Sequence, residues 1–149
     1  MPRVRRTRVI DASRDAVWEV VADPHHLPRW WPGVERVEEA SRESWTEVLR
    51  TGKGKVVRAD FTRVDEDSPG RLAWRQEIDE SPFERFLAKS LTEVSLEPEG
   101  RGATRVGVRM TQRLRGLARL GSPMVRRATA RQLDEALEGL DAITGRRDA

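Results

Sequence analysis

Cysteine and tyrosine are absent from the 149-residue chain, and the only histidines are His25 and His26. The absence of cysteine excludes a disulfide framework, a thiolate metal site and a cysteine nucleophile. A Ser-His-acid triad would be the remaining common nucleophilic site, but no group of residues in the sequence indicates one. The sequence therefore identifies no catalytic residue. A transition-metal site usually needs several converging ligands, most often including histidine. Two adjacent histidines with scattered carboxylates therefore predict no metal site and no cofactor.

Long apolar runs are also missing. No run approaches the roughly 18–20 residues needed to cross a membrane, and no charged-then-apolar segment opens the chain. We therefore expect a cytoplasmic protein without a transmembrane segment. The length predicts one domain over residues 1–149, large enough to form a core. The sequence leaves open whether the protein is a monomer or a homodimer.

Charged residues are abundant and nearly balanced. They make up 36% of the chain against 37% apolar residues, so the core is modest or built around a hollow. The 28 basic residues, most of them arginine, face 25 acidic ones, which leaves a net charge of +3. The planar fork of arginine suits phosphate. The near balance nevertheless favours a solvated surface, so nucleic acid is an unlikely partner, and we expect at most weak, salt-sensitive binding to nucleic acid or anionic vesicles.

Residues 121–145 predict one long amphipathic helix, with Ser122 as its N-cap and Gly145 at its C-terminal end. At about 100° per residue, apolar and polar side chains separate onto two faces. The apolar face is formed by Val125, Thr129, Gln132, Leu133, Ala136, Leu137, Leu140 and Ile143, and the polar face by Arg127, Arg131, Asp134, Glu138 and Asp141. Such a helix cannot cover its own apolar face, so we expect its leucines to be buried and Arg127 and Glu138 to be exposed.

The start of the chain predicts a strand followed by two short helices. Residues 3–11 read as a strand near a sheet edge, because they carry many charges. Ser13 is a good N-cap for the first helix, and Asp23 followed by Pro24 restarts the chain as a second cap. Pro32 helps to keep this second helix short.

Six further strands are expected between these helices and the last one. Alternating apolar and polar residues indicate strands, and Pro-Gly and Gly-rich turns separate them. The predicted strands are residues 34–40, 45–51, 57–62, 72–79, 83–97 and 106–114. Short connections between successive strands imply an antiparallel meander. The predicted class is therefore α+β, with a bent seven-stranded antiparallel sheet wrapped around the long C-terminal helix.

Several stretches carry a resemblance to a known superfamily. They are Ile10-Asp11-Ala12-Ser13 through Trp18, Ala22-Asp23-Pro24, Leu27-Pro28-Arg29-Trp30-Trp31-Pro32, Pro69-Gly70-Arg71-Leu72-Ala73-Trp74 and residues 97–106. The chain resembles START-like proteins, also described as polyketide cyclase/dehydratase-like or SRPBCC proteins with a helix-grip fold. The resemblance covers essentially the whole chain. It implies a seven-stranded sheet gripping the C-terminal helix, a cavity between them, and two short helices closing one end.

Polar residues on apolar faces point to the same cavity. Gln76 and Gln112 lie in phase with apolar strand residues, and Thr129 and Gln132 lie within the apolar face of the helix. Burying an unpaired amide costs on the order of 1–3 kcal/mol. A wet cavity would satisfy these groups, although each could instead reach bulk water near the end of its element. The predicted cavity residues are Trp30, Trp31, Phe61, Trp74, Gln76, Met110, Gln112, Thr129 and Gln132.

Other groups allow two interpretations each. Trp30 and Trp31 either line a cavity entrance or fill the core. A histidine of the adjacent pair acts at a cavity mouth or is simply exposed. Arginines around residues 113–131 either contact an anionic partner or pair with acidic residues on the helix; Arg131 and Glu135, four residues apart, make that pairing easy.

The leading hypothesis is a domain that binds a small hydrophobic or amphipathic molecule in an internal cavity, for transport or sequestration. Superfamily members include ligand carriers, hormone receptors and polyketide cyclases, so fold alone does not decide function. One alternative is a cyclase or dehydratase acting on a polyketide-like substrate. The other is an interaction protein that uses an arginine-rich surface. A buried titratable group in the cavity would favour catalysis, and a closed, filled interior would favour interaction.

Overall fold

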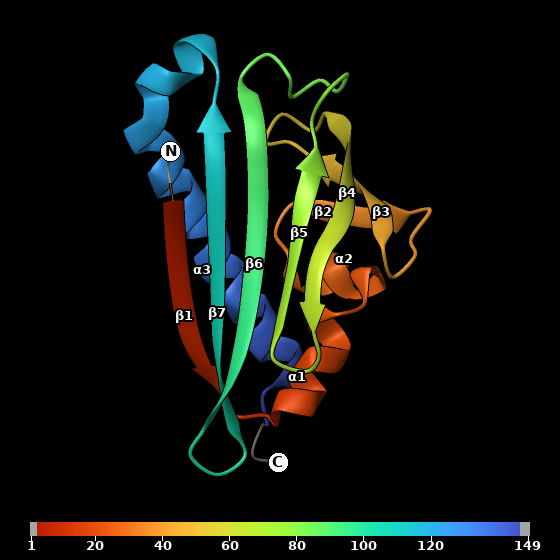
Figure 1. Ribbon diagram of the computed structural model, residues 1–149, viewed down its shortest axis with the longest axis vertical. Coiled ribbons are helices and arrows are strands. Elements are labelled where there is room, and N and C mark those ends of the chain that lie inside the picture. The colour runs from red at the N-terminus through yellow and green to blue at the C-terminus, as the bar shows by residue number, and fades with distance from the viewer. Residues whose placement is uncertain (1–2, 147–149) are drawn as a thin grey trace.

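The fold is that of a computed structural model, which describes residues 3–146. In chain order its elements are β1 (Arg3–Ile10), α1 (Arg14–Val21), η1 (Pro24–His26), α2 (Leu27–Trp30), β2 (Val34–Glu38), β3 (Ser44–Arg50), β4 (Val56–Asp67), β5 (Arg71–Glu77), β6 (Leu87–Glu99), β7 (Ala103–Leu114), η2 (Gly116–Gly121) and α3 (Ser122–Thr144). The two η elements are short 3₁₀ helices. Figure 1 shows α3 crossing behind the long strands β6 and β7.

The sheet is antiparallel and has seven strands in the order β1-β7-β6-β5-β4-β3-β2. Strands β2 to β7 follow one another as the predicted meander, while β1 pairs with β7. The prediction that the charged first strand lies at an edge is confirmed. The sheet, the long C-terminal helix and the two short helical segments after β1 confirm the predicted helix-grip fold.

Helix α3 is the continuous C-terminal helix that the periodicity predicts. Leu133, Leu137 and Leu140 are buried, whereas Arg127 and Glu138 are exposed. The buried leucines share one core cluster with Val94 and Val106 of the sheet and other side chains. Burial of each leucine is worth about 1.5–3 kcal/mol, so this stripe holds the helix in the grip. Within the part of the chain described, no helix is long and apolar enough to cross a membrane.

The two short helical segments begin where the sequence predicts. The Ser13 hydroxyl accepts a hydrogen bond from the Ala16 amide at 3.2 Å, and the Asp23 carboxylate accepts one from the His25 amide at 3.0 Å. Each side chain thereby satisfies an amide that the first turn leaves without a helical partner. Helix α2 then packs closely on α3. A Cβ atom at Gly139 would lie only 2.7 Å from the Trp30 carbonyl oxygen, so glycine permits this contact.

Several predicted boundaries are wrong, and three of them are informative. Ser122 is not the N-cap of α3, because η2 runs directly into the helix and places Ser122 already in helical backbone; Gly121 holds the cap position. The sixth strand starts at Leu87 rather than at Phe83, because the Ser81 hydroxyl accepts from the Phe83 amide and a turn follows, closed by the Leu87 amide and the Phe83 carbonyl. Strand β4 continues to Asp67, paired with β5.

Replacing Leu137 should test the grip directly. Leu137 is 2% exposed, so Leu137→Ala removes buried methyl groups and leaves a cavity. We expect the free energy of unfolding to fall by about 2–5 kcal/mol, measured by urea denaturation. Glu138→Ala, one residue along on the exposed face, is the matched control and should change it by less than about 0.5 kcal/mol. Equal effects of the two substitutions would contradict the assigned packing.

Candidate functional site

A cavity of about 220 Å³ lies between the sheet and α3. Its walls come from β3 to β7, from α3, from Trp31 after α2 and from the loop that precedes β6. Seven of the nine predicted cavity residues line it: Trp31, Phe61, Trp74, Gln76, Met110, Gln112 and Gln132. Trp30 and Thr129 are not among the lining residues. The fold therefore gathers side chains that are widely separated in the sequence around one hollow.

Strand register explains why the polar and aromatic lining residues face the same hollow. Phe61 of β4 lies opposite Gln76 of β5, and Ser90 of β6 lies opposite Gln112 of β7. Residues two apart on a strand share a face. A second row therefore runs beside the first, in which Thr92 lies opposite both Trp74 and Met110. The lining is thus one row of mainly polar side chains beside a row that is mainly apolar.

An aromatic cluster forms the inner wall. The Trp74 ring contacts the rings of Trp31 and Trp45 edge-on, with centroids 5.8 and 5.9 Å apart. The Trp45 ring stacks on Phe61 at 6.0 Å. The ring of Trp30, which does not line the cavity, contacts the Trp31 ring edge-on, with centroids 5.4 Å apart. Such edge and offset contacts add to the burial of large apolar rings, so this wall is well held.

Trp30, the last residue of α2, and Trp31, which follows it, do not form the predicted entrance. Trp30 and Trp31 are 3% and 7% exposed, and both belong to the core cluster. Trp30 is core alone, because α2 packs it toward α3, whereas Trp31 is both core and cavity wall. The exposed lining residue is Phe86, at 46%, whose ring contacts Phe83 edge-on. The opening therefore lies beside these phenylalanines in the loop before β6.

Glu47 is the one titratable residue of the cavity lining, and sequence reasoning missed it. It is 4% exposed, and its carboxylate accepts a hydrogen bond from the Trp45 indole nitrogen at 3.1 Å. Loss of hydration raises the pKa of Glu47 from 4.5 to about 7, although the indole bond acts in the opposite direction. The available signal was strand phase, since Glu47 alternates in step with Trp45 and Leu49. A carboxyl group that titrates near neutrality thus lies within an aromatic cavity.

The three glutamines line the cavity rather than all reaching bulk solvent. The side-chain nitrogen of Gln76 is buried and has no hydrogen-bond partner within residues 3–146. The Gln112 side-chain oxygen accepts a long hydrogen bond of 3.4 Å from the Thr129 hydroxyl. Thr129 therefore positions a lining amide without lining the cavity itself. An unsatisfied buried donor costs about 1–3 kcal/mol, which a bound acceptor could recover.

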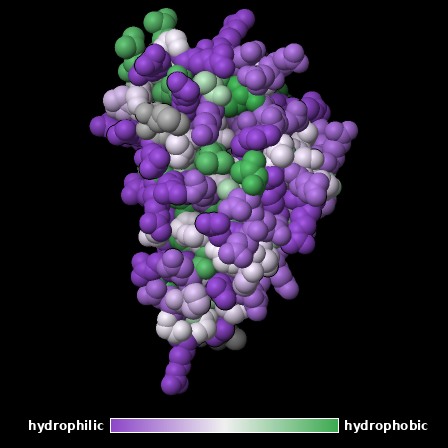
Figure 2. Space-filling view, viewed as in Figure 1, coloured by the Kyte–Doolittle hydropathy of each residue, from purple (hydrophilic) through white to green (hydrophobic). Residues whose placement is uncertain are grey.

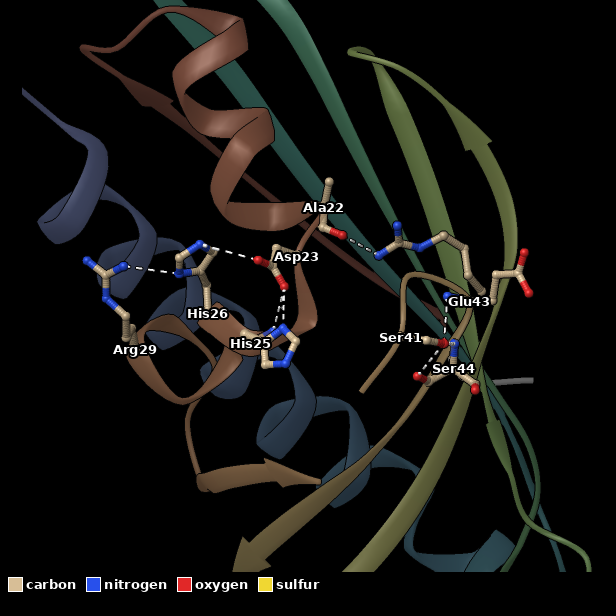
Figure 3. Close-up of polar contacts among 9 residues, drawn as sticks. Ala22, Asp23, His25, His26, Arg29, Ser41, Glu43 and Ser44 are labelled. Atoms are coloured by element: carbon tan, nitrogen blue, oxygen red, sulfur yellow. Dashed lines mark hydrogen bonds and ion pairs between the residues drawn. The ribbon is translucent and has the colours of Figure 1, made fainter. Parts of the chain in front are cut away.

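The histidine pair lies elsewhere, on the outer surface. His25 borders an open groove of about 420 Å³ beside α1, and its side chain is 66% exposed. Its ring nitrogen lies 2.9 Å from the Asp23 carboxylate, and a His26 ring nitrogen lies 3.1 Å from Arg29 (Figure 3). The groove is larger than the cavity, but it is more open to solvent. We therefore take the cavity as the candidate site.

The described residues also offer no candidate metal site. Over the described part of the chain, no group of three or more histidine and acidic side chains is arranged to hold a metal ion. The expected absence of a metal and of a cofactor stays a prediction.

Fold and site together define a START-like helix-grip domain with an internal cavity. The sequence profile of the family described as "Polyketide cyclase / dehydrase and lipid transport" matches residues 1–143. The chain belongs to this family. No curated protein sequence matches it.

Solved structures share the fold at low sequence identity. A START superfamily protein from Mycobacterium smegmatis is 15% identical, with 95% of this chain and 96% of that chain covered and a TM-score of 0.79. The protein TTHA0849 from Thermus thermophilus is 24% identical, with 95% of both chains covered and a TM-score of 0.76. The Zhui aromatase/cyclase from Streptomyces sp. R1128 is 20% identical, with 94% and 91% covered and a TM-score of 0.74. These likenesses show the helix-grip fold.

Ionisation of Glu47 should make stability depend on pH. Because its pKa is raised in the folded state, its contribution to stability is full below about pH 4.5 and is lost as the pH rises to about 7. The glutamine of Glu47→Gln cannot ionise. As the pH rises from about 4.5 to 8, we therefore expect the free energy of unfolding of this variant to rise relative to that of the parent protein, by up to about 3 kcal/mol. Urea denaturation across this range measures the difference.

The control for this experiment is Glu135→Gln, on the exposed face of α3. Its stability should follow the parent curve at every pH. Parallel curves for the parent and Glu47→Gln would show instead that the Glu47 carboxyl ionises as it does in the unfolded chain.

Proposed function

We propose that the protein binds a small, largely apolar molecule that carries a carbonyl or hydroxyl oxygen, inside the cavity between the sheet and α3. The observation that carries this proposal is the unpartnered side-chain nitrogen of Gln76 in a lining that includes five aromatic side chains. An oxygen of the ligand would accept the missing hydrogen bond. The family, whose description includes lipid transport, supports a ligand-binding role.

The lining matches this chemistry in both its parts. Trp31, Phe61 and Trp74 offer broad flat contact to an apolar skeleton, and Met110 adapts to irregular shapes. Gln76 and the other lining glutamines offer both donors and acceptors. Apolar walls with a few placed polar groups are the usual composition of small-molecule sites.

The volume limits the size of the ligand. Drug-sized sites usually enclose about 300–1,000 Å³, and this cavity encloses about 220 Å³. The ligand is therefore small, or the cavity enlarges as it enters. Phe83 and Phe86 lie in a loop rather than in the sheet, so their movement offers the least costly enlargement.

A second candidate function is catalysis, and Glu47 is the observation that favours it. A carboxyl group with a pKa of about 7 can both give and accept a proton near neutrality. In a dehydration, the protonated Glu47 would protonate a departing hydroxyl group, which leaves as water. The resulting carboxylate would then accept a proton from the adjacent carbon. The structurally similar Zhui protein is an aromatase/cyclase, which gives this candidate its reaction class.

Other features of the protein stay predictions. They are its cytoplasmic location, its organisation as one domain over residues 1–149, and its monomeric or homodimeric state. The hollow interior gives no support to a role in surface interaction alone.

Binding of naphthol tests the proposed function. Naphthol combines a flat apolar skeleton with one hydroxyl group, and its fluorescence and the quenching of tryptophan emission both report binding. Naphthalene lacks the hydroxyl group. We expect Gln76→Leu to reduce the preference for naphthol over naphthalene by about tenfold, the worth of one hydrogen bond in a buried site.

The matched control is Glu77→Leu, the next residue of β5, whose side chain points to the opposite face of the sheet. It should leave the preference unchanged. Failure of naphthol to quench tryptophan emission, or an unchanged preference in Gln76→Leu, would refute the proposed site. Native mass spectrometry of freshly purified protein then identifies any small molecule that co-purifies.

Catalysis is tested separately with Glu47→Gln. If the protein dehydrates an aromatic-forming polyketide analogue, this substitution should reduce turnover by about a hundredfold or more, because general acid–base catalysis is worth that much. Naphthol binding by the same variant should persist. Undiminished turnover in Glu47→Gln would exclude Glu47 as the proton donor.

A further inference from the structure

The connection from β7 into α3 exposes large apolar side chains. Leu117 and Leu120 of η2 are 85% and 81% exposed, and Met124 in the first turn of α3 is 76% exposed. Figure 2 shows a hydrophobic group at the upper left of the molecule, over η2 and the start of α3, with hydrophilic surface beside it. We call residues 113–131, which include these three side chains, the basic tip.

The basic tip is strongly cationic. It contains Arg113, Arg115, Arg119, Arg126, Arg127 and Arg131, and no acidic residue. Of the two interpretations of this cluster, pairing with acidic residues of α3 is wrong. Within residues 3–146, the only ion pair of these arginines joins Arg115 to Asp79, at 3.9 Å.

Two of the four acidic residues of α3 pair with β1 instead. Asp134 pairs with Arg6 of β1 at 3.5 Å, and Asp141 pairs with Arg8 at 2.7 Å. Both lie further along α3, over the part of the helix that the sheet grips. The positive charge of the basic tip is therefore left for an external partner.

The basic tip lies beside the opening of the cavity. The Arg115 amide donates a hydrogen bond to the Phe86 carbonyl at 2.8 Å, which joins the end of β7 to the loop before β6. Phe86 lines the cavity and is itself 46% exposed. In Figure 1 the same end of the molecule, at the top, holds η2, the start of α3 and the beginning of β6.

We propose that this end of the protein docks onto an anionic lipid surface, with Leu117, Leu120 and Met124 inserted among the lipids and the arginines against the headgroups. Exposed apolar side chains surrounded by arginine are the composition of segments that lie in a membrane interface. Arginines near an anionic leaflet contribute about 1 kcal/mol each. Either contribution alone gives weak binding, and the tip supplies both.

Other partners fit less well. Nucleic acid phosphates would engage the arginines but leave three large apolar side chains in water. A second copy of the chain would cover those side chains, but it would bring two sets of arginines together, which repel each other. An anionic lipid surface satisfies both features at once. Entry of the ligand from the lipid through the adjacent opening rests on the proposed function, whereas the docking does not.

Vesicle flotation tests the proposal. The full-length protein should float with vesicles of phosphatidylcholine mixed with phosphatidylglycerol, and not with vesicles of phosphatidylcholine alone. Added salt should weaken this binding, since it screens the arginines. Binding should nevertheless persist at physiological salt, because the apolar insertion is not screened. This departs from the weak, salt-sensitive binding expected from the charge balance, because the structure exposes three large apolar side chains beside the arginines.

Two variants separate the contributions. Leu117→Ser with Leu120→Ser should weaken binding to the mixed vesicles by at least about tenfold, because apolar area no longer enters the lipid. Arg126→Gln with Arg127→Gln should weaken it by about fivefold for each arginine removed. All four side chains are exposed, so thermal unfolding should be unchanged.

Matched controls lie away from the tip. Val9→Ser replaces an apolar side chain of β1 that is 47% exposed, and Arg101→Gln replaces an exposed arginine in the turn between β6 and β7. Neither should alter vesicle binding. Absence of flotation with the mixed vesicles, or an equal loss in the controls, would overturn the proposal. So would a homodimer that dissociates in the leucine variant while vesicle binding is absent.

The failure of this proposal can be told apart from failure of the proposed function. Naphthol binding should be unchanged in the leucine and arginine variants. Vesicle binding without naphthol binding would support the docking surface and refute the proposed function of the cavity. Naphthol binding without vesicle binding would support the function of the cavity and refute the docking surface. Binding of duplex DNA that is as tight as vesicle binding, and insensitive to the leucine changes, would assign the arginines to nucleic acid.

Discussion

The C-terminal half of α3 packs tightly against the sheet and α2, and the positions of the cavity and of the exposed start of α3 depend on this contact. Leu133, Ala136, Leu137 and Leu140 are buried there, and Gly139 lets the Trp30 backbone approach closely. In the N-terminal half only Thr129 is buried. A stiff helix pressed tightly at one end cannot follow a bent sheet at the other. The cavity and the exposed start of α3 both result from this difference in packing between the two halves of the helix.

The hollow contains groups that reduce stability. A buried Glu47 carboxyl and an unpartnered Gln76 amide are poor choices for a core that only has to fold. The aromatic contacts around Trp74 offset part of this cost by packing large rings. Departures from good core chemistry are expected where a site has a function, and Glu47 and Gln76 line the same cavity.

Most of the fold was accessible from the sequence, because local rules decide it. Helical periodicity located α3, Ser13 and Asp23 marked the caps, and strand phase oriented Gln76 toward the interior. Glu47 was missed although its phase was correct, because a charged residue type is seldom buried. The lining role of Trp30 and the pairing of Arg131 were also wrongly expected. Both depend on how α2 and α3 pack against the rest of the protein, and local sequence patterns do not encode that packing.

The position of β1 at the edge of an open sheet has a consequence for solubility. An exposed edge presents unpaired backbone groups that can recruit a strand from another molecule and start aggregation. Four of the eight residues of β1 are arginine, and two of them are tied to α3 through Asp134 and Asp141. An incoming strand would have to approach this row of positive charge. The arginines thereby disfavour pairing of another strand at this edge of the sheet.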